Sequence, residues 1–226
     1  MIVEFNDCSV RYGARTALDR LSVRIEGTRL GVIGLNGSGK TTFARLINGL
    51  SVPSEGKVVV NGIDTGLEPE RARMEAGFVF QSPHTQLIMP IVQDDIALGL
   101  KARGLKQREA DSRAMEVLAR FGIEALARRR VHELSGGELQ LAAIASVLAL
   151  EPRILVLDEP TSQLDLRNRH RVTGAIDTLP EDAVVVTHDL ELAARLPRLL
   201  LFHEGRLLAD GPPGETIPHY LSIAGC

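Results

Sequence analysis

The stretch that most constrains this chain is "GLNGSGKTT", residues 34–42. It follows the apolar segment "RLGVIG" and precedes a helical pattern, so a glycine-rich loop is expected to join a strand to a helix. Its glycines, among them Gly37 and Gly39, lack a Cβ, which lets backbone N–H groups curve around an anion. Because the dipole of the following helix also favours an anion, the pattern predicts a phosphate-binding loop.

Two side chains at the end of this loop extend the prediction to a nucleotide. Lys40 is expected to place its charge on the β and γ phosphates, and Thr41 to offer its hydroxyl to Mg²⁺. A glycine turn that arose by chance is the alternative. The strand before the loop and the helix after it argue against that alternative.

A pair of acids follows a second apolar segment, "ILVLDEP". A strand buried on both faces has this composition, and ligands bind at the carboxyl ends of such strands. We expect Asp158 to hold Mg²⁺ through water, and Glu159 to act as a general base or to position the attacking water. The alternative is that the acids only cap the helix after Pro160.

Three further residues are candidates that local pattern alone leaves open. Gln81 ends the strand "GFVF" and could touch Mg²⁺ or the attacking water, or be a polar strand end. His188 ends "AVVVTH" and could hydrogen-bond a γ-phosphate, or be an ordinary surface histidine. Tyr12 precedes the phosphate loop and could stack on adenine, or pack on a sheet.

The order of helices and strands predicts an α/β fold, a P-loop nucleotide-binding core with a mainly parallel sheet. An antiparallel β region is expected at the N-terminus, and "RLLLFHEGRLLADG" is expected to form a hairpin turning at Glu204-Gly205. We expect one domain over residues 1–226, with a helical subdomain at about 90–150 inserted in the core.

A net charge of −3 disfavours nucleic acid as a partner, and neither a signal peptide nor a membrane-spanning segment is recognised. Cys8 and Cys226 form no metal or disulfide pattern.

A second glycine-rich helix start lies in "VHELSGGELQ", residues 131–140. Ser135 and Glu138 have the spacing of a capping box. A capping box does not explain Gly136 and Gly137, because each glycine costs about 1 kcal/mol in a helix relative to alanine. We therefore expect a ligand to approach this backbone closely.

Taken in order, these motifs resemble the ATP-binding subunits of ABC transporters over essentially the whole chain. The resemblance includes the signature "LSGGE" at 134–138 and the "SQLD" loop at 162–165. In that family two subunits pair head to tail, and ATP lies between the phosphate loop of one and the signature loop of the other. The resemblance assigns ATP binding to Tyr12, Gly34, Asn36, Gly37, Ser38, Gly39, Lys40, Thr41 and Thr42. It assigns catalysis to Glu159, His188 and Gln81, and Mg²⁺ to Thr41, Gln81 and Asp158. The signature loop, acting on the partner's ATP, would be Leu134, Ser135, Gly136, Gly137 and Glu138, with Asp165 in a dimer loop.

The glutamine segment "FVFQSPHTQLIMP" is similar to that of energy-coupling factor ATPases, which serve cobalt, nickel and biotin uptake. This resemblance implies an ATPase that powers import of a vitamin or metal ion through an integral membrane partner, as a homodimer or heterodimer at the cytoplasmic side of the membrane. Leu141, where an arginine is usual, and Gln163 depart from the family pattern. The transported substrate is expected to be chosen by a membrane subunit, not by this chain.

Three alternatives remain at this point. The first is the ATPase of a conventional ABC importer or of an exporter. The second is a soluble ABC-type ATPase that clamps DNA or ribosomes, which long coiled-coil or tandem inserts would favour. The third is a P-loop kinase or GTPase, which would leave the signature loop and His188 unexplained.

Overall fold

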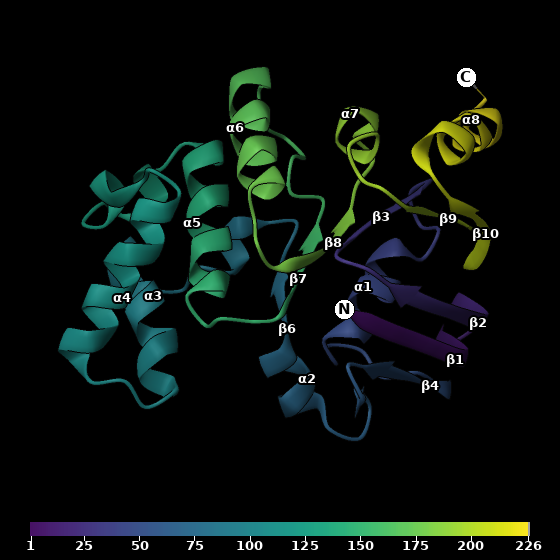
Figure 1. Cartoon of the computed structure of the whole chain (residues 1–226), viewed down its shortest axis with the longest axis horizontal. Helices are drawn as coiled ribbons and strands as arrows, with labels where there is room; N and C mark the ends of the chain where they lie inside the picture. Colours follow the sequence, from purple (N-terminus) through teal and green to yellow (C-terminus); the bar gives the residue numbers. More distant parts are fainter. Residues whose placement is uncertain (226) are drawn as a thin grey trace. The chain divides into compact units, whose positions relative to one another are not determined.

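The computed structural model describes residues 1–225, which divide into two compact units. The first unit comprises residues 1–78, 153–159 and the segment from 181 onward, and the second comprises residues 79–152 and 160–180. The first unit contains the strands and several helices, and the second unit is mainly helical (Figure 1).

The first unit contains two sheets and four helices. The antiparallel sheet has the order β2 (Arg15–Glu26), β1 (Ile2–Tyr12), β4 (Glu55–Val60), β5 (Ile63–Asp64). The larger sheet has the order β10 (Arg206–Gly211), β9 (Leu199–His203), β3 (Arg29–Gly34), β8 (Asp182–Val186), β7 (Ile154–Asp158), β6 (Ala76–Val79), and β6 reaches the boundary of the two units. The helices are α1 (Lys40–Ile47), α2 (Pro69–Glu75), α7 (Leu190–Ala193) and α8 (Pro213–Ala224).

The centre of the larger sheet is parallel, as the sequence predicts. Strand β3 pairs in parallel with β8 on one side and with β9 on the other, and β7 pairs in parallel with β8. All five residues of β7 are buried, and so are Ala183 and the three valines that follow it in β8. The carboxyl ends of β3, β7 and β8 therefore meet at one edge of the sheet, where polar residues follow them.

Helix α1 is held between the two sheets by aromatic packing. The ring of Phe43 stacks on Phe5 of β1 at 4.6 Å between centroids and lies 5.1 Å from Phe202 of β9. All three rings are almost fully buried. Since α1 begins at Lys40, this packing fixes the position of the phosphate loop that precedes it.

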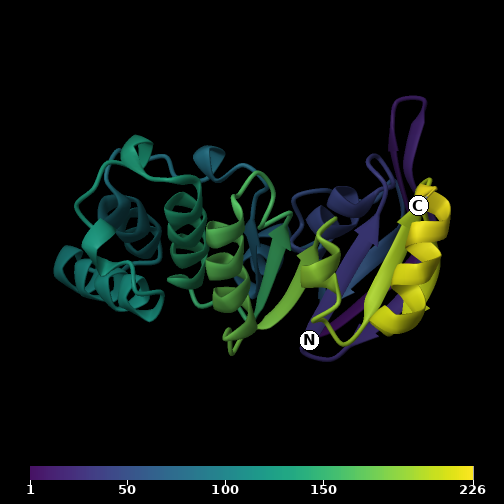
Figure 2. The same ribbon diagram turned by 90° about the horizontal axis from the view of Figure 1, so that it is seen from above.

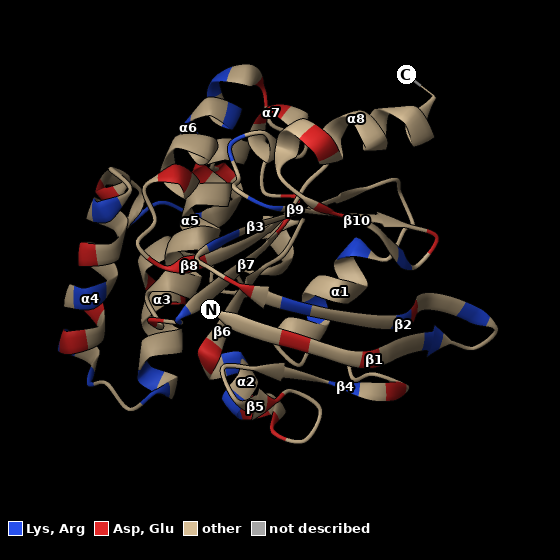
Figure 3. Ribbon diagram, turned by 45° about the vertical axis from the view of Figure 1, so that its right-hand side comes forward, with Lys and Arg blue, Asp and Glu red and all other residues tan. Residues whose placement is uncertain are grey.

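The second unit is mainly helical. It contains α3 (Val92–Ala102), α4 (Gln107–Arg120), α5 (Gly136–Leu148) and α6 (Leu166–Asp177), with short 3₁₀ turns at Pro83–Thr85, Glu124–Leu126 and Val131–Glu133. Helix α5 is buried along almost its entire length and contacts α3, α4 and α6. Charges of both signs cover α4, which marks its solvent-exposed side (Figure 3).

The helices predicted after the phosphate loop and after Ser135 are present, and so is the hairpin turn. Glu204 and Gly205 form the turn between β9 and β10, both with positive φ. Helices α2, α7 and α8 were not predicted. In α2 only Ala72 is buried, and α8 contains Pro213 and Pro218, so neither segment has the apolar periodicity by which a helix is recognised. Helix α8 lies along β9 and β10 (Figure 2).

Across residues 1–225, the structure contains no helix that combines the length and the apolar character needed to cross a membrane.

Candidate functional site

The phosphate loop is held in shape by backbone around it. A Cβ at Gly34, whose φ is 149°, would lie 2.2 Å from the carbonyl oxygen of Phe202, and one at Gly39 would lie 2.5 Å from that of Ala17. The N–H of Gly205, in the β9–β10 turn, donates to the carbonyl of Ser38 at 3.0 Å. Gly34 and Gly39 are thus required by the protein's own packing as well as by any anion inside the loop.

Two side chains of the loop have polar atoms placed for an anion. The hydroxyl of Ser38 is buried and has no hydrogen-bond partner within residues 1–225. The ammonium of Lys40 donates to the carbonyls of Gly34 at 2.7 Å and Leu35 at 3.1 Å. Burial lowers the pKa of Lys40, and the nearby carboxylates of Glu159 and Asp158 oppose that shift. A cation that is mostly desolvated beside an open backbone cradle is suited to bind phosphate.

Asp158 lies at the end of β7 and is paired with the first turn of α1. The hydroxyl of Thr41 donates to its Oδ1 at 3.2 Å. Asp158 is only 3% exposed, and burial raises the pKa of its carboxyl, which the hydrogen bond from Thr41 partly opposes. A hydroxyl and a carboxylate oxygen side by side are the hard oxygen donors that Mg²⁺ takes in phosphate sites. The residues present therefore fit a magnesium ion.

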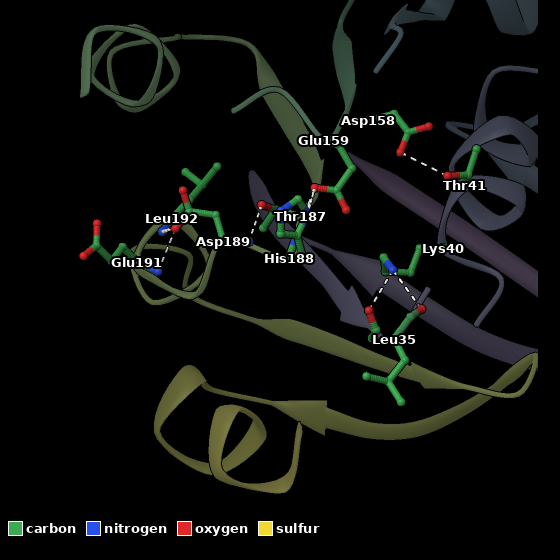
Figure 4. Close-up of polar contacts among 11 residues, drawn as sticks. Leu35, Lys40, Thr41, Asp158, Glu159, Thr187, His188, Asp189, Glu191 and Leu192 are labelled. Atoms are coloured by element: carbon green, nitrogen blue, oxygen red, sulfur yellow. Dashed lines mark hydrogen bonds and ion pairs between the residues drawn. The ribbon is translucent and has the colours of Figure 1, made fainter. Parts of the chain in front are cut away.

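Glu159 and His188 are brought together from the ends of adjacent strands (Figure 4). One carboxylate oxygen of Glu159 lies 2.6 Å from Nδ1 of His188 and accepts the backbone N–H of the same residue at 3.2 Å. Glu159 itself has a φ of 53° and donates its N–H to the carbonyl of Val186. The carboxylate is 9% exposed whereas the His188 ring is 58% exposed, so a buried carboxylate is linked to a ring that reaches solvent.

The capping box predicted at the start of α5 is confirmed. The carboxylate of Glu138 accepts the backbone N–H of Ser135 at 2.9 Å and its hydroxyl at 2.8 Å. The N–H of Glu138 lies 3.4 Å from the Ser135 hydroxyl. These hydrogen bonds from Ser135 are the main reason that the pKa of Glu138 is lowered.

The two glycines of this loop have different surroundings. Gly136 is exposed, and a Cβ there would meet only the end of the Leu164 side chain, at 3.3 Å. Gly137 is buried, and a Cβ there would lie 2.3 Å from Oδ1 of Asn168 in α6. Gly137 therefore has a steric reason within the chain, in addition to the approach of a ligand that the sequence predicts.

The remaining predicted residues lie at the end of β1 and in the second unit. Tyr12 ends β1 with about half of its surface exposed, and its hydroxyl is 3.5 Å from the hydroxyl of Ser51. Gln81 is exposed and follows β6, and Asp165 accepts the N–H of Asn168 as the N-cap of α6. Gln81 and Asp165 both lie in the second unit.

Three residues that were not predicted as site residues contact these segments. Arg15 pairs across the β1–β2 turn with Tyr12, and its guanidinium lies 3.4 Å from the carbonyl of Gly37 in the phosphate loop. Gln86 accepts the N–H of Phe80 at 3.1 Å and donates to the carbonyl of Ala143 at 3.4 Å, which ties the glutamine segment to α5. Asn168 is the third. Only Gln86 carried a sequence signal, its place in the glutamine-loop pattern.

Known proteins resemble this chain in sequence and in structure. Residues 18–162 match the family model described as "ABC transporter". The chain is 60% identical over 224 residues to the biotin transport ATP-binding protein BioM of Rhizobium etli, covering 99% of this chain and 100% of that protein. It is 38% identical over 213 residues to the energy-coupling factor transporter ATP-binding protein EcfA1 of Halalkalibacterium halodurans, covering 91% of this chain and 77% of that protein. The structure is similar to the dimeric bacterial ABC transporter cassette MJ0796, with a TM-score of 0.83 and 27% identity, covering 93% of this chain and 98% of that one.

Proposed function

The chain belongs to the ABC transporter family of ATP-binding proteins, and we propose on that premise that it is the ATP-hydrolysing subunit of a biotin importer. It is an ATPase of the energy-coupling factor type that works with membrane subunits. The observation that carries the proposal is the cluster of Lys40, Thr41, Asp158, Glu159 and His188 at one edge of the parallel sheet.

ATP binding begins at the phosphate loop. The backbone N–H groups of residues 34–42 and the start of α1 surround the phosphates. The ammonium of Lys40, which donates to the carbonyls of Gly34 and Leu35 in this structure, donates to phosphate oxygens instead. The unpartnered hydroxyl of Ser38 gains an acceptor in the same step. Tyr12, on the exposed end of β1, stacks on the adenine.

Hydrolysis of the β–γ bond uses the residues at the ends of β7 and β8. Thr41 and Asp158 would hold Mg²⁺, which when bound would neutralise charge on the phosphates. The resemblance to the family adds Gln81 as a further ligand of this ion. Glu159 orients a water molecule and accepts its proton as the oxygen attacks the γ-phosphorus. His188 holds the Glu159 carboxylate through its backbone N–H and ring, and its exposed ring contacts the γ-phosphate.

A second subunit completes each site. In the head-to-tail arrangement that we propose, the exposed start of α5 lies over the partner's γ-phosphate, with Leu134 to Glu138 as the contact. Asp165 belongs to the same surface. The dimeric state of the similar cassette supports this arrangement. Residues 1–226 act as one ATPase domain with the helical part from about 90 to 150 inserted in it, located peripherally at the cytoplasmic face of the membrane.

Identity of 60% over the full length of a biotin transport protein supports biotin as the cargo. The test is uptake of labelled biotin by biotin-requiring cells that express the chain with its membrane partners. We expect uptake with the wild-type chain and none with Lys40→Ala. Uptake of labelled cobalt or nickel instead of biotin would contradict the substrate while leaving the ATPase assignment intact. If the cells take up neither biotin, cobalt nor nickel although the chain hydrolyses ATP, the role in import would be contradicted.

A further inference from the structure

A close contact inside the second unit joins the signature loop to the loop that carries Asp165. The backbone of Gly137, in the first turn of α5, faces Asn168, in the first turn of α6. An added Cβ at Gly137 would lie 2.3, 2.4 and 2.7 Å from Oδ1, Cγ and Cβ of Asn168. Rotating the Asn168 side chain moves the first two atoms but leaves its Cβ in place, so the contact cannot be relieved by a change of rotamer.

Asn168 also holds Asp165. Its backbone N–H donates to one carboxylate oxygen of Asp165 at 2.8 Å, and its side-chain amide donates to the other at 3.2 Å. Both oxygens of the carboxylate are thereby directed toward α6. One half-buried side chain thus touches the signature helix with one side and fixes the aspartate loop with the other.

Gly136, one residue earlier, provides the contrast. It is exposed, and the nearest atom to an added Cβ is the tip of the Leu164 side chain at 3.3 Å, which can move. Nothing in the described chain requires glycine at position 136, whereas Asn168 requires it at position 137.

We propose that Asn168 is a positioning residue that locks the signature loop and the aspartate loop of one subunit into a single surface. The inference rests on the proposed function, since both loops act on the partner subunit's ATP only in a dimer. Gly137 is present so that Asn168 can lie against α5, and Gly136 is present for the approach of the partner's nucleotide.

The test is a set of variants at positions 136, 137 and 168. Gly137→Ala forces its Cβ against Asn168. Asn168→Ala leaves a Cβ 2.7 Å from the new methyl, whereas Asn168→Gly removes it. We expect Gly137→Ala to weaken ATP-dependent dimerisation and kcat by about five- to a hundredfold, the range implied by overpacking. Adding Asn168→Gly restores dimerisation to within about threefold of Asn168→Gly alone, and adding Asn168→Ala does not, since interacting positions give non-additive effects. Neither Asn168→Gly nor Asn168→Ala is expected to restore dimerisation to Gly136→Ala.

Monomer ATP affinity, measured by titration, separates positioning from binding and is expected to be unchanged in every variant. Thermal unfolding without ATP gives a second readout of the Gly137–Asn168 contact, which remains informative if a variant is inactive. Dimerisation of Gly137→Ala at the wild-type level, or a defect that Asn168→Gly leaves unrepaired in both dimerisation and unfolding, would overturn the inference. A wild-type chain that fails to hydrolyse ATP or to dimerise with it would instead overturn the proposed function.

Discussion

Replacing Glu159 with glutamine tests the hydrolytic site with little change in shape. In the structure, one carboxylate oxygen accepts the backbone N–H of His188 and lies 2.6 Å from its ring nitrogen. A glutamine amide can keep the oxygen toward that N–H. The side chain loses its negative charge and its ability to accept a proton, while its volume and its contact with the backbone N–H of His188 remain.

The magnitude follows from the role assigned to the carboxylate. General-base catalysis contributes about 10²- to 10⁴-fold in rate, or roughly 2.7 to 5.5 kcal/mol in the barrier. Folding is expected to change by less than about 1 kcal/mol, a shift of no more than roughly 2–4 °C in Tm for a chain of this size. ATP affinity should be retained or increased, because a negative charge near Lys40 and the phosphates is removed.

The assay is single-turnover hydrolysis of labelled ATP, together with size-exclusion chromatography in the presence of ATP. We expect Glu159→Gln to accumulate an ATP-bound dimer with hydrolysis reduced at least a hundredfold. The matched control is Glu191→Gln, which makes the same change in charge at an exposed residue of α7. Hydrolysis by Glu159→Gln within threefold of wild type would refute the reasoning.

Three further predictions follow from the geometry. Lys40→Ala should weaken ATP binding by about 30-fold or more, the loss expected for a buried charge contact of roughly 2 kcal/mol, and calorimetric titration that finds unchanged affinity would count against the cradle. Because hydrogen bonds from Ser135 lower the folded pKa of Glu138 below its ordinary value of 4.5, this group stabilises the fold above that pH and loses its contribution as pH falls. Ser135→Ala should therefore cost about 1 kcal/mol at pH 7 and less at pH 3, as measured by urea unfolding. Gly205→Ala introduces a side chain at a φ of 78° and 3.0 Å from the Ala17 carbonyl oxygen. It should therefore destabilise the fold by about 1 kcal/mol or more and weaken ATP binding. Wild-type stability and wild-type ATP affinity in this variant would contradict the role of the contact between Gly205 and Ser38.

Much of the fold was predictable because its signals are local in the chain. The strand before residues 34–42, the buried strand before Asp158 and the start of α5 each combine hydrophobic pattern with glycine or acidic residues at fixed spacing. The parallel sheet follows from their order. What local pattern could not reveal are contacts between distant segments, such as Gly34 against Phe202, or Arg15 against Gly37.

The two glycines at the start of α5 illustrate this limit. Judged from the spacing alone, both glycines serve the same purpose, which is to let a ligand approach the backbone closely. The reason for Gly137 is Asn168, some thirty residues later, and no rule of spacing links the two. His188 is a further example, because only the pairing of β7 with β8 brings its ring to Glu159.

The place of β3 in its sheet has a consequence for how the protein is made. Both strands that pair with β3, and the turn that donates to Ser38, come from residues 182–205. A ribosome translates residues 34–42 early, yet neither strand that pairs with β3 exists until residues 182–203 have been made. The phosphate-binding sequence is therefore present in a nascent chain well before the strands that support it.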